Sequence, residues 1–236
     1  MTLQLGYLTL TLAVCILLIY FGFTTINKSY DEPTRKRKKT ILVLSIILWQ
    51  VYLGIVGSTE FILSYSFPPR FAITMIIPAF IFTGVFVYRN RNKAWLLNLP
   101  TKQVFFFQSF RILVESLFVA SVGAGILHKE ASIEGYNFDM VYALTVPFVG
   151  LIAFSRQSSN LKLIRFWNYL GLVVLASVIF VFMTSIYAPE LYGADKPLLP
   201  LEAITYPYGL VAGCLMPVAV FMHVLSIAQL NRILRN

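Results

Sequence analysis

The sequence predicts an all-α fold, a polytopic transmembrane helix bundle of seven spans with its N-terminus outside and its C-terminus in the cytoplasm. Three observations predict this class. The chain is 58% hydrophobic and only 12% charged, whereas a soluble globular domain has about 25% charged residues. Seven apolar stretches are long enough to cross a hydrocarbon core, which needs about 20 residues per helix. Basic residues gather in alternate loops, as the positive-inside rule describes.

The first three helices are predicted at 3–23, 41–64 and 71–88. The first stretch lacks the basic n-region and the small-residue cleavage site of a signal peptide, so we expect it to remain as a helix. The second contains Gln50 close to its middle and Glu60 nearer its outer end.

The remaining helices are predicted at 104–127, 138–155, 167–187 and 205–229. Together the seven spans occupy most of the chain. We therefore expect a single transmembrane domain over residues 1–236, without a separate soluble domain.

Proline and cysteine residues inside the predicted spans indicate local features of the helices. Pro78, Pro147 and Pro217 fall near the middle of three predicted helices, where proline commonly kinks or breaks the helix. Cys15 and Cys214 both lie inside predicted spans, where we expect them to pack as small apolar residues.

The loop charges give the orientation. Of the 19 Lys and Arg residues, 15 fall in one alternate set of loops, whereas only Asp31 and Glu32 among the acidic residues do so. These basic residues are Lys28, Arg35, Lys36, Arg37, Lys38, Lys39, Arg89, Arg91, Lys93, Lys102, Arg156, Lys162, Arg165, Arg232 and Arg235. Because positive loops remain in the cytoplasm, we expect a multi-pass protein of the cell membrane, the inner membrane of a bacterium.

The densest basic run is Arg35, Lys36, Arg37, Lys38 and Lys39. Such a run either fixes the topology alone or also binds anionic lipid headgroups, with each residue contributing about 1 kcal/mol near the surface. The net charge of +9 is accounted for by these loops, so no nucleic acid partner is expected. A homo-oligomer or a membrane partner stays open.

The fourth predicted helix contains Gln108, Arg111 and Glu115 within an apolar run. Spacings of three and four residues place them on one helix face. A charged residue at the centre of a membrane helix costs about 2.5–3.5 kcal/mol, and such residues commonly mark functional sites. We expect Glu115 near the midplane, with Arg111 one turn below it and paired with it along the helix.

Three roles remain open for this polar stripe: a buried ion pair that fixes helix register, a site that contacts a substrate, ion or proton, and an interface with a partner. Gln50, Glu60 and His223 complete the site if their helices pack nearby.

On the outer face, the sequence before the fifth helix contains Glu134, Asn137 and Asp139. We expect Asn137 to cap the helix and Asp139 to lie in its first turn, where a negative charge suits the helix dipole. The alternative is a hard cation held by Glu130, Glu134 and Asp139, although their spacing matches no calcium loop.

The run Gln108-Ser109-Phe110-Arg111 with Glu115, followed by Glu134-Gly135-Tyr136-Asn137-Phe138-Asp139, resembles a pattern in small uncharacterised multi-pass bacterial membrane proteins. The resemblance covers about a third of the chain. It implies that the fourth helix and the start of the fifth form one unit, and it carries no activity.

Several cofactors are not expected. The predicted helix 205–229 has no lysine, which retinal attachment in a rhodopsin requires. His128 and His223 are predicted at different depths, which does not suit a haem with two histidine ligands. We therefore expect no cofactor and no bound metal.

The first functional hypothesis is a small transporter, channel or proton-linked carrier. In it, Glu115 titrates or binds an ion, Arg111 is its counter-charge, and Gln108, Gln50 and His223 form polar lining. The second is a non-catalytic membrane scaffold or sensor subunit whose stripe binds a partner. The third is a membrane-embedded enzyme acting on a lipid or isoprenoid. An enzyme is the least favoured, because no recognisable nucleophile and base accompany the stripe.

Overall fold

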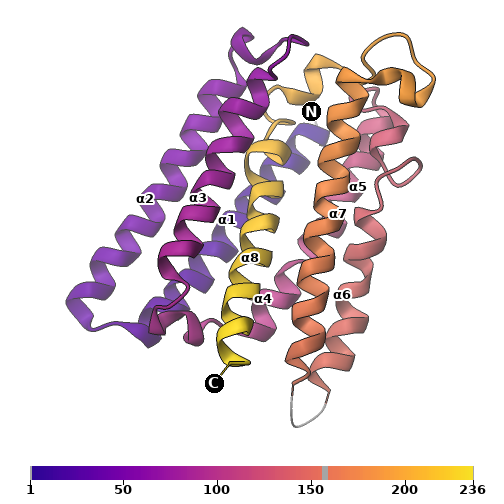
Figure 1. The fold of residues 1–236 in the computed structure, drawn as a ribbon. Helices are drawn as coiled ribbons and strands as arrows, with labels where there is room; N and C mark the ends of the chain where they lie inside the picture. Colours follow the sequence, from indigo (N-terminus) through magenta and orange to yellow (C-terminus); the bar gives the residue numbers. More distant parts are fainter. Residues whose placement is uncertain (1, 156–158, 236) are drawn as a thin grey trace.

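The computed structural model describes residues 2–155 and 159–235. Within these ranges the chain is all-helical, with 79% helix and no strands. Figure 1 shows the helices side by side in one bundle, with the two termini at opposite ends. Arg156, one of the basic loop residues counted above, lies outside the described residues.

The α-helices are α1 (Thr2–Ser29), α2 (Glu32–Gly57), α3 (Ile77–Asn90), α4 (Thr101–Phe107), α5 (Phe110–Gly123), α6 (Asp139–Phe154), α7 (Leu161–Tyr187) and α8 (Met216–Ile233). Short 3-10 helices lie in the connections: η1 (Glu60–Ile62), η3 (Ala94–Asn98), η4 (Lys129–Ala131), η5 (Pro189–Tyr192) and η6 (Leu201–Ile204). Two π-helical turns, η2 (Ala72–Ile76) and η7 (Val211–Leu215), lead directly into α3 and α8.

Six helical stretches in the described part of the chain are long and apolar enough to cross a membrane. They are Thr2–Ser29, Glu32–Gly57, Ala72–Asn90, Thr101–Gly123, Leu161–Tyr187 and Val211–Ile233. The apolar helix α6 has only 16 residues, about 24 Å at 1.5 Å per residue, which is shorter than a hydrocarbon core of about 30 Å. The chain is an integral membrane protein with six candidate spans, where the sequence predicts seven.

The helix α6 is short because the chain before it folds back into the bundle. Arg111 contacts Asp139, the first residue of α6, although α5 continues for 12 further residues, about 18 Å, to Gly123. Figure 1 accordingly shows α6 beginning well below the end of α5. The segment 124–138 descends between them, and its residues Ala131 and Ser132 are completely buried.

The helix predicted at 104–127 is broken into α4 and α5. Gln108 and Ser109 lie between the two helices, and their amides donate to carbonyls only three residues earlier, those of Phe105 and Phe106. Such tighter bonds are typical of a helix interrupted by a 3-10 turn. The two helices still form one candidate span.

Two segments far apart in the sequence share one local structure. Each π-helical turn ends two residues before a proline, Pro78 or Pro217. The two segments correspond residue by residue. Ala72 and Val211 are 139 positions apart in the sequence, and so are Pro78 and Pro217. Both prolines therefore closely follow a π-helical turn and lie inside the continuous spans Ala72–Asn90 and Val211–Ile233, and Pro147 lies inside α6.

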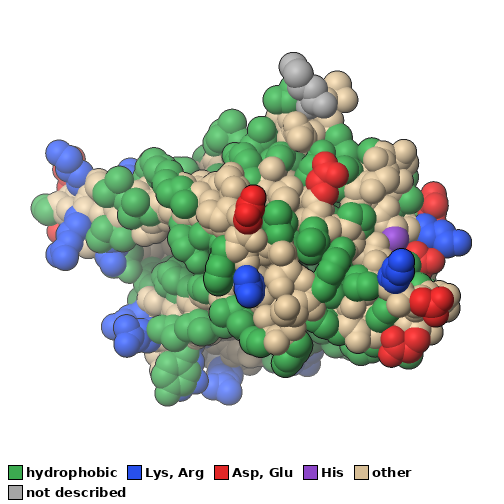
Figure 2. Space-filling model, turned by 90° about the horizontal axis from the view of Figure 1, so that it is seen from above, with side chains coloured by type: hydrophobic (Ala, Val, Ile, Leu, Met, Phe, Trp, Pro, Cys, Tyr) green, Lys and Arg blue, Asp and Glu red, His purple; other side chains and the backbone are tan. Residues whose placement is uncertain are grey.

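The centre of the bundle is formed by α4, α5 and α8. In both Thr101–Gly123 and Val211–Ile233, 56% of the most apolar window is buried, against 11% in α2. The apolar residues of α2 are thus mostly exposed, as expected for a helix that faces lipid. The loops rich in Lys and Arg lie at the end of the bundle that holds the C-terminus (Figure 1). Figure 2 shows the opposite end, where acidic and basic side chains are scattered among hydrophobic ones.

Candidate functional site

Arg111 lies at the centre of a buried polar cluster and is 2% exposed. Its Nε donates to Oδ2 of Asp139 at 3.0 Å, and its Nη2 pairs with Oδ1 of the same carboxylate. Two parallel bonds between a guanidinium and a carboxylate form the strongest common ion-pair geometry. The expected partner was Glu115 on the same helix, but the structure pairs Arg111 with Asp139 on α6.

The other side of the guanidinium contacts His223 of α8. Nη1 of Arg111 lies 2.9 Å from Nε2 of His223, and Nδ1 of His223 lies 2.8 Å from Oδ1 of Asn168 on α7. The amide nitrogen of Asn168 donates to the carbonyl of Ile164, so its oxygen accepts from His223. This network assigns the proton to Nδ1 and leaves Nε2 to accept from Arg111, which makes His223 neutral.

Aromatic side chains complete the surroundings of Arg111. Its guanidinium lies over the ring of Tyr142 on α6, 4.7 Å from the centroid, a favourable cation–π position. The Tyr142 ring stacks on Trp167 at 4.4 Å, and its hydroxyl donates to the Trp167 carbonyl at 2.6 Å. The contacts of Arg111 and its partners thus join α5, α6, α7 and α8.

Glu115, one turn further along α5, has a different environment. It is 1% exposed, and Nδ2 of Asn137 donates to both of its carboxylate oxygens, at 3.2 and 3.0 Å. Within the described residues, no Lys, Arg or His nitrogen lies within 4.0 Å of this carboxylate. Since Asp139 already offsets Arg111, the site contains one more carboxyl group than cation.

Asn137 connects the two carboxyl groups. Its amide nitrogen also donates to the Ala131 carbonyl at 3.0 Å, and its oxygen accepts from the amide of Asp139 at 3.0 Å. The N-cap of α6 is Phe138, where the sequence predicts Asn137, which instead binds the first amide of the helix through its side chain. Asn137 and Asp139 are both buried in the bundle, whereas the sequence placed them on the outer face.

A cavity of about 90 Å³ adjoins this polar cluster. Arg111, Glu115 and Asp139 lie on its polar side, together with Tyr7 of α1. The Tyr7 hydroxyl is 2.7 Å from the Ser121 hydroxyl. The rest of the wall is mostly apolar and includes Phe71, Ile76, Phe110, Phe118, Leu175 and Leu215. A mostly apolar pocket with a few polar groups at one side is the usual form of a small-molecule site.

The other predicted site residues lie outside this cluster. Gln108 is buried at the break between α4 and α5, where its Nε2 donates to the Ala219 carbonyl at 3.3 Å. Gln50 contacts the Cys214 sulfur at 3.2 Å. Glu60 and Glu134 are exposed, in η1 and in the segment before α6. The structure thus brings together Arg111, Glu115, Asn137, Asp139 and His223.

Sequence reasoning missed Asn168 and Tyr142. Asn168 did carry a signal, because an amide within the apolar stretch 167–187 is a typical hydrogen-bonding residue between membrane helices. Tyr142 had none, since tyrosine is common in these spans. Comparisons with protein-family models, with curated proteins and with solved structures found no match for the chain.

Outside the spans, His128 and Glu130 form a hydrogen bond, with Nδ1 of the histidine 3.2 Å from the carboxylate. Burial lowers the pKa of His128 from its usual 6.5, and Glu130 only partly offsets this shift. Burial acts to raise the pKa of Glu130, but its hydrogen bonds to backbone and to His128 lower it overall. Both lowered pKa values favour the deprotonated forms in the folded segment 124–138, neutral for His128 and ionised for Glu130.

Proposed function

We propose that the protein is a small proton-linked carrier in which Glu115 binds either a proton or a cationic substrate. The observation that carries this proposal is the position of the Glu115 carboxyl group, buried beside an apolar cavity with Asn137 as its described partner. A buried ionised carboxylate without a counter-charge is costly. Ionisable residues inside membrane spans commonly lie on proton or ion pathways.

The charges of the site favour a cation as the substrate. Arg111 and Asp139 offset each other, and His223 is neutral in the tautomer that its contacts require. When Glu115 is ionised, the site carries one net negative charge, which either a proton or an ammonium group neutralises. Phe110 and Phe118 in the cavity wall offer aromatic faces that suit such a cation.

The size of the cavity limits the substrate to a small molecule. Its volume of about 90 Å³ is of the same order as the roughly 150 Å³ of an engineered cavity that holds benzene, a molecule close in size to a small quaternary ammonium ion. The proposal therefore concerns compact alkylamines or quaternary ammonium ions, exchanged against a proton at Glu115.

The carrier proposal includes seven crossings, with the N-terminus outside in the cell membrane. In it, α6 forms the fifth crossing. The opposite positions of the termini support an odd number of crossings. The basic loops at the C-terminal end support a cytoplasmic position for that end, where the run 35–39 meets anionic headgroups.

The test uses the full chain in phosphatidylcholine liposomes that contain a pH-sensitive dye, with tetramethylammonium added outside. Exchange of the cation for a proton makes the lumen alkaline. We expect Glu115→Gln to abolish this signal while the protein stays folded. Glu60→Gln is the matched control, because it changes an exposed glutamate and is expected to keep full activity. A fully active Glu115→Gln protein, or a wild-type chain that moves no protons, would sink the proposal.

A second candidate, a scaffold or sensor subunit, is favoured by the Arg111 contacts. The guanidinium, Asp139, His223 and Asn168 are paired with one another across four helices, as in a structural ion pair. This candidate predicts no proton movement by the wild-type chain in the liposomes. It also predicts that Glu115→Gln alters oligomeric state in detergent, measured by light scattering.

A further inference from the structure

The two matched π-helical turns each leave a backbone carbonyl without its helical partner. A proline has no amide to donate to the carbonyl four residues before it. For Pro78 this carbonyl belongs to Thr74, and for Pro217 it belongs to Gly213. Inside a membrane, such freed carbonyls must find other donors, commonly on neighbouring helices.

Both carbonyls accept their hydrogen bonds from one place, the C-terminal half of α2. The Tyr52 hydroxyl donates to the Thr74 carbonyl at 2.9 Å, and Nε1 of Trp49 donates to the Gly213 carbonyl at 3.0 Å. The two donors are stacked on each other, with ring centroids 5.2 Å apart and an interplanar angle of 25°. Thr74 and Gly213 are also equivalent positions of the two turns, because they too are 139 positions apart in the sequence.

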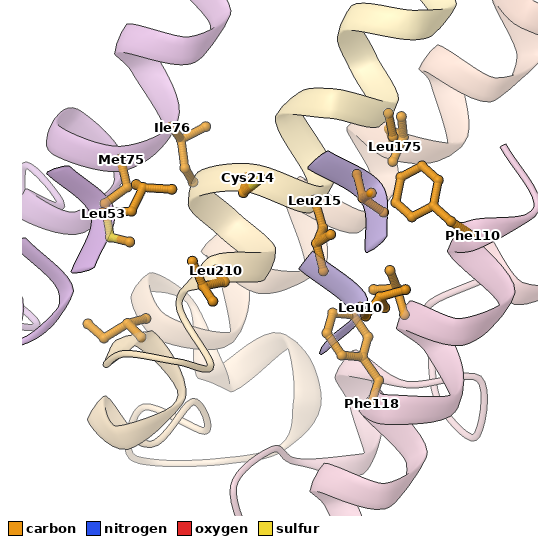
Figure 3. Close-up of a cluster of buried hydrophobic side chains, with 14 of the residues drawn as sticks. Leu10, Leu53, Met75, Ile76, Phe110, Phe118, Leu175, Leu210, Cys214 and Leu215 are labelled. Atoms are coloured by element: carbon orange, nitrogen blue, oxygen red, sulfur yellow. The ribbon is translucent and has the colours of Figure 1, made fainter. Parts of the chain in front are cut away.

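Packing reinforces these two hydrogen bonds. Leu53, one residue after Tyr52, is completely buried, and Figure 3 shows it next to Met75 of η2. A side-chain carbon at Gly213 would lie 2.5 Å from Leu53 and 3.2 Å from Met75. A glycine therefore allows α2, η2 and η7 to meet this closely.

The two π-helical turns also form part of the cavity wall. Ile76 of η2 and Val211 and Leu215 of η7 line the cavity beside Glu115. Any movement of these turns changes the size of the cavity or its access. Trp49 and Tyr52 are absent from that wall and lie behind it.

We propose that Trp49 and Tyr52 form a latch that couples η2 to η7, so that the two parts of the cavity wall open together. Each donor holds one carbonyl, and the stacked rings transmit a displacement of one turn to the other. The latch concerns motion of the wall and does not rest on proton-linked transport, so failure of the carrier proposal leaves it intact.

Hydrogen–deuterium exchange of the full chain in detergent tests the coupling. Tyr52→Phe removes the donor to Thr74 and no other heavy atom. Loss of a net hydrogen bond corresponds to about two- to tenfold faster exchange of the amides it protects. We expect this acceleration in residues 72–77 and also in residues 211–216, which Tyr52 does not contact through its hydroxyl. Acceleration confined to 72–77 would overturn the latch.

Tyr65→Phe is the matched control. It also removes a tyrosine hydroxyl bound to a backbone carbonyl, that of Leu199 at 2.9 Å, but it lies outside both turns. We expect it to leave exchange in 72–77 and 211–216 within twofold of the wild-type rate. An equal acceleration in this control would mean that the Tyr52→Phe effect is a general loosening of the bundle, and the latch would be rejected.

A second variant tests the role of the proline. Pro78→Ala restores an amide that can donate to the Thr74 carbonyl, so this carbonyl no longer needs Tyr52. We expect Tyr52→Phe to have no effect on exchange of 211–216 in the Pro78→Ala background. A Tyr52→Phe effect of undiminished size there would contradict the proposed coupling through the freed carbonyl.

Discussion

Arg111 and Glu115 are one turn apart on α5 and are both almost completely buried, yet their environments differ. Arg111 is bound by a bidentate carboxylate, a neutral imidazole and an aromatic ring. Glu115 is held through a single amide nitrogen, that of Asn137, and faces the cavity. One group has its counter-charge within the bundle, whereas the other pairs with no Lys, Arg or His side chain of the described residues.

The difference is set by the antiparallel register of α6 against α5. Because the segment 124–138 folds back along α5, Asp139 reaches the depth of Arg111 and Asn137 reaches the depth of Glu115. A shift of α6 by one turn towards Glu115 would bring Asp139 to the depth of Glu115 and take this carboxylate away from Arg111. The chemical role of each charge therefore depends on the neighbouring helix more than on its own position in the sequence.

The largest expected effect comes from Asp139→Asn, which removes the counter-charge of a buried guanidinium. Breaking a buried ion pair from one side costs about 3–5 kcal/mol. We expect a loss of this size in the free energy of unfolding, measured by denaturant titration in detergent micelles. Glu115→Gln makes the matching isosteric change in the uncompensated carboxyl group, and we expect it to cost under about 1 kcal/mol, the range of a single neutral hydrogen bond.

Equal destabilisation by the two variants would remove the distinction between the two environments. A double variant, Arg111→Met with Asp139→Leu, sharpens the result further. Replacing both members of a buried pair by apolar residues is often neutral or stabilising. We expect it to recover most of the stability that Asp139→Asn loses.

Gly171→Ala is expected to have an intermediate effect, because it alters the Arg111 side without changing a polar group. A methyl group at Gly171 of α7 would collide with the His223 ring and the Tyr142 hydroxyl. Such overpacking typically costs about 1–3 kcal/mol. The same denaturant titration measures it.

Gly84→Ala on α3 is the control for this prediction, since a methyl group there would meet nothing within 4 Å. We expect it to be neutral or slightly stabilising, because alanine has the higher helix propensity. If Gly171→Ala were equally neutral, the space around His223 would not be as restricted as its contacts indicate.

The all-helical fold with several membrane-length helices could be predicted from the sequence, because helix length and apolar content depend on local composition. The polar residues Gln108, Arg111 and Glu115 were also found, since charges in an apolar run stand out. The hydrogen-bonding partners of Arg111 and Glu115 could not be predicted, because they depend on the depth at which α6 begins. Asp139 looks like a helix-dipole residue in the sequence, and nothing local to it indicates that the preceding segment folds inward.

The smallest expected effect is a loosening of the segment 124–138 at acid pH. The lowered pKa of His128 means that the folded segment binds this proton less readily than the unfolded one does. Stability from this group is present above pH 6.5 and is lost as the pH falls below it. The lowered pKa of Glu130 acts in the same sense, with stability present above pH 4.5 and lost as the pH falls further.

This loosening is expected to affect the environment of Glu115 more than that of Arg111, because Asn137 of the segment binds Glu115. We expect hydrogen exchange of 124–138, corrected for the intrinsic pH dependence, to rise between pH 7 and pH 5. His128→Gln removes the titrating ring and is expected to flatten that rise, whereas Glu60→Gln, an exposed change in η1, is expected to leave it intact. If the His128→Gln protein showed the same pH dependence, His128 would be excluded as its cause. If exchange in α8 around His223 rose in parallel, the contacts of Arg111 would depend on the same segment as those of Glu115.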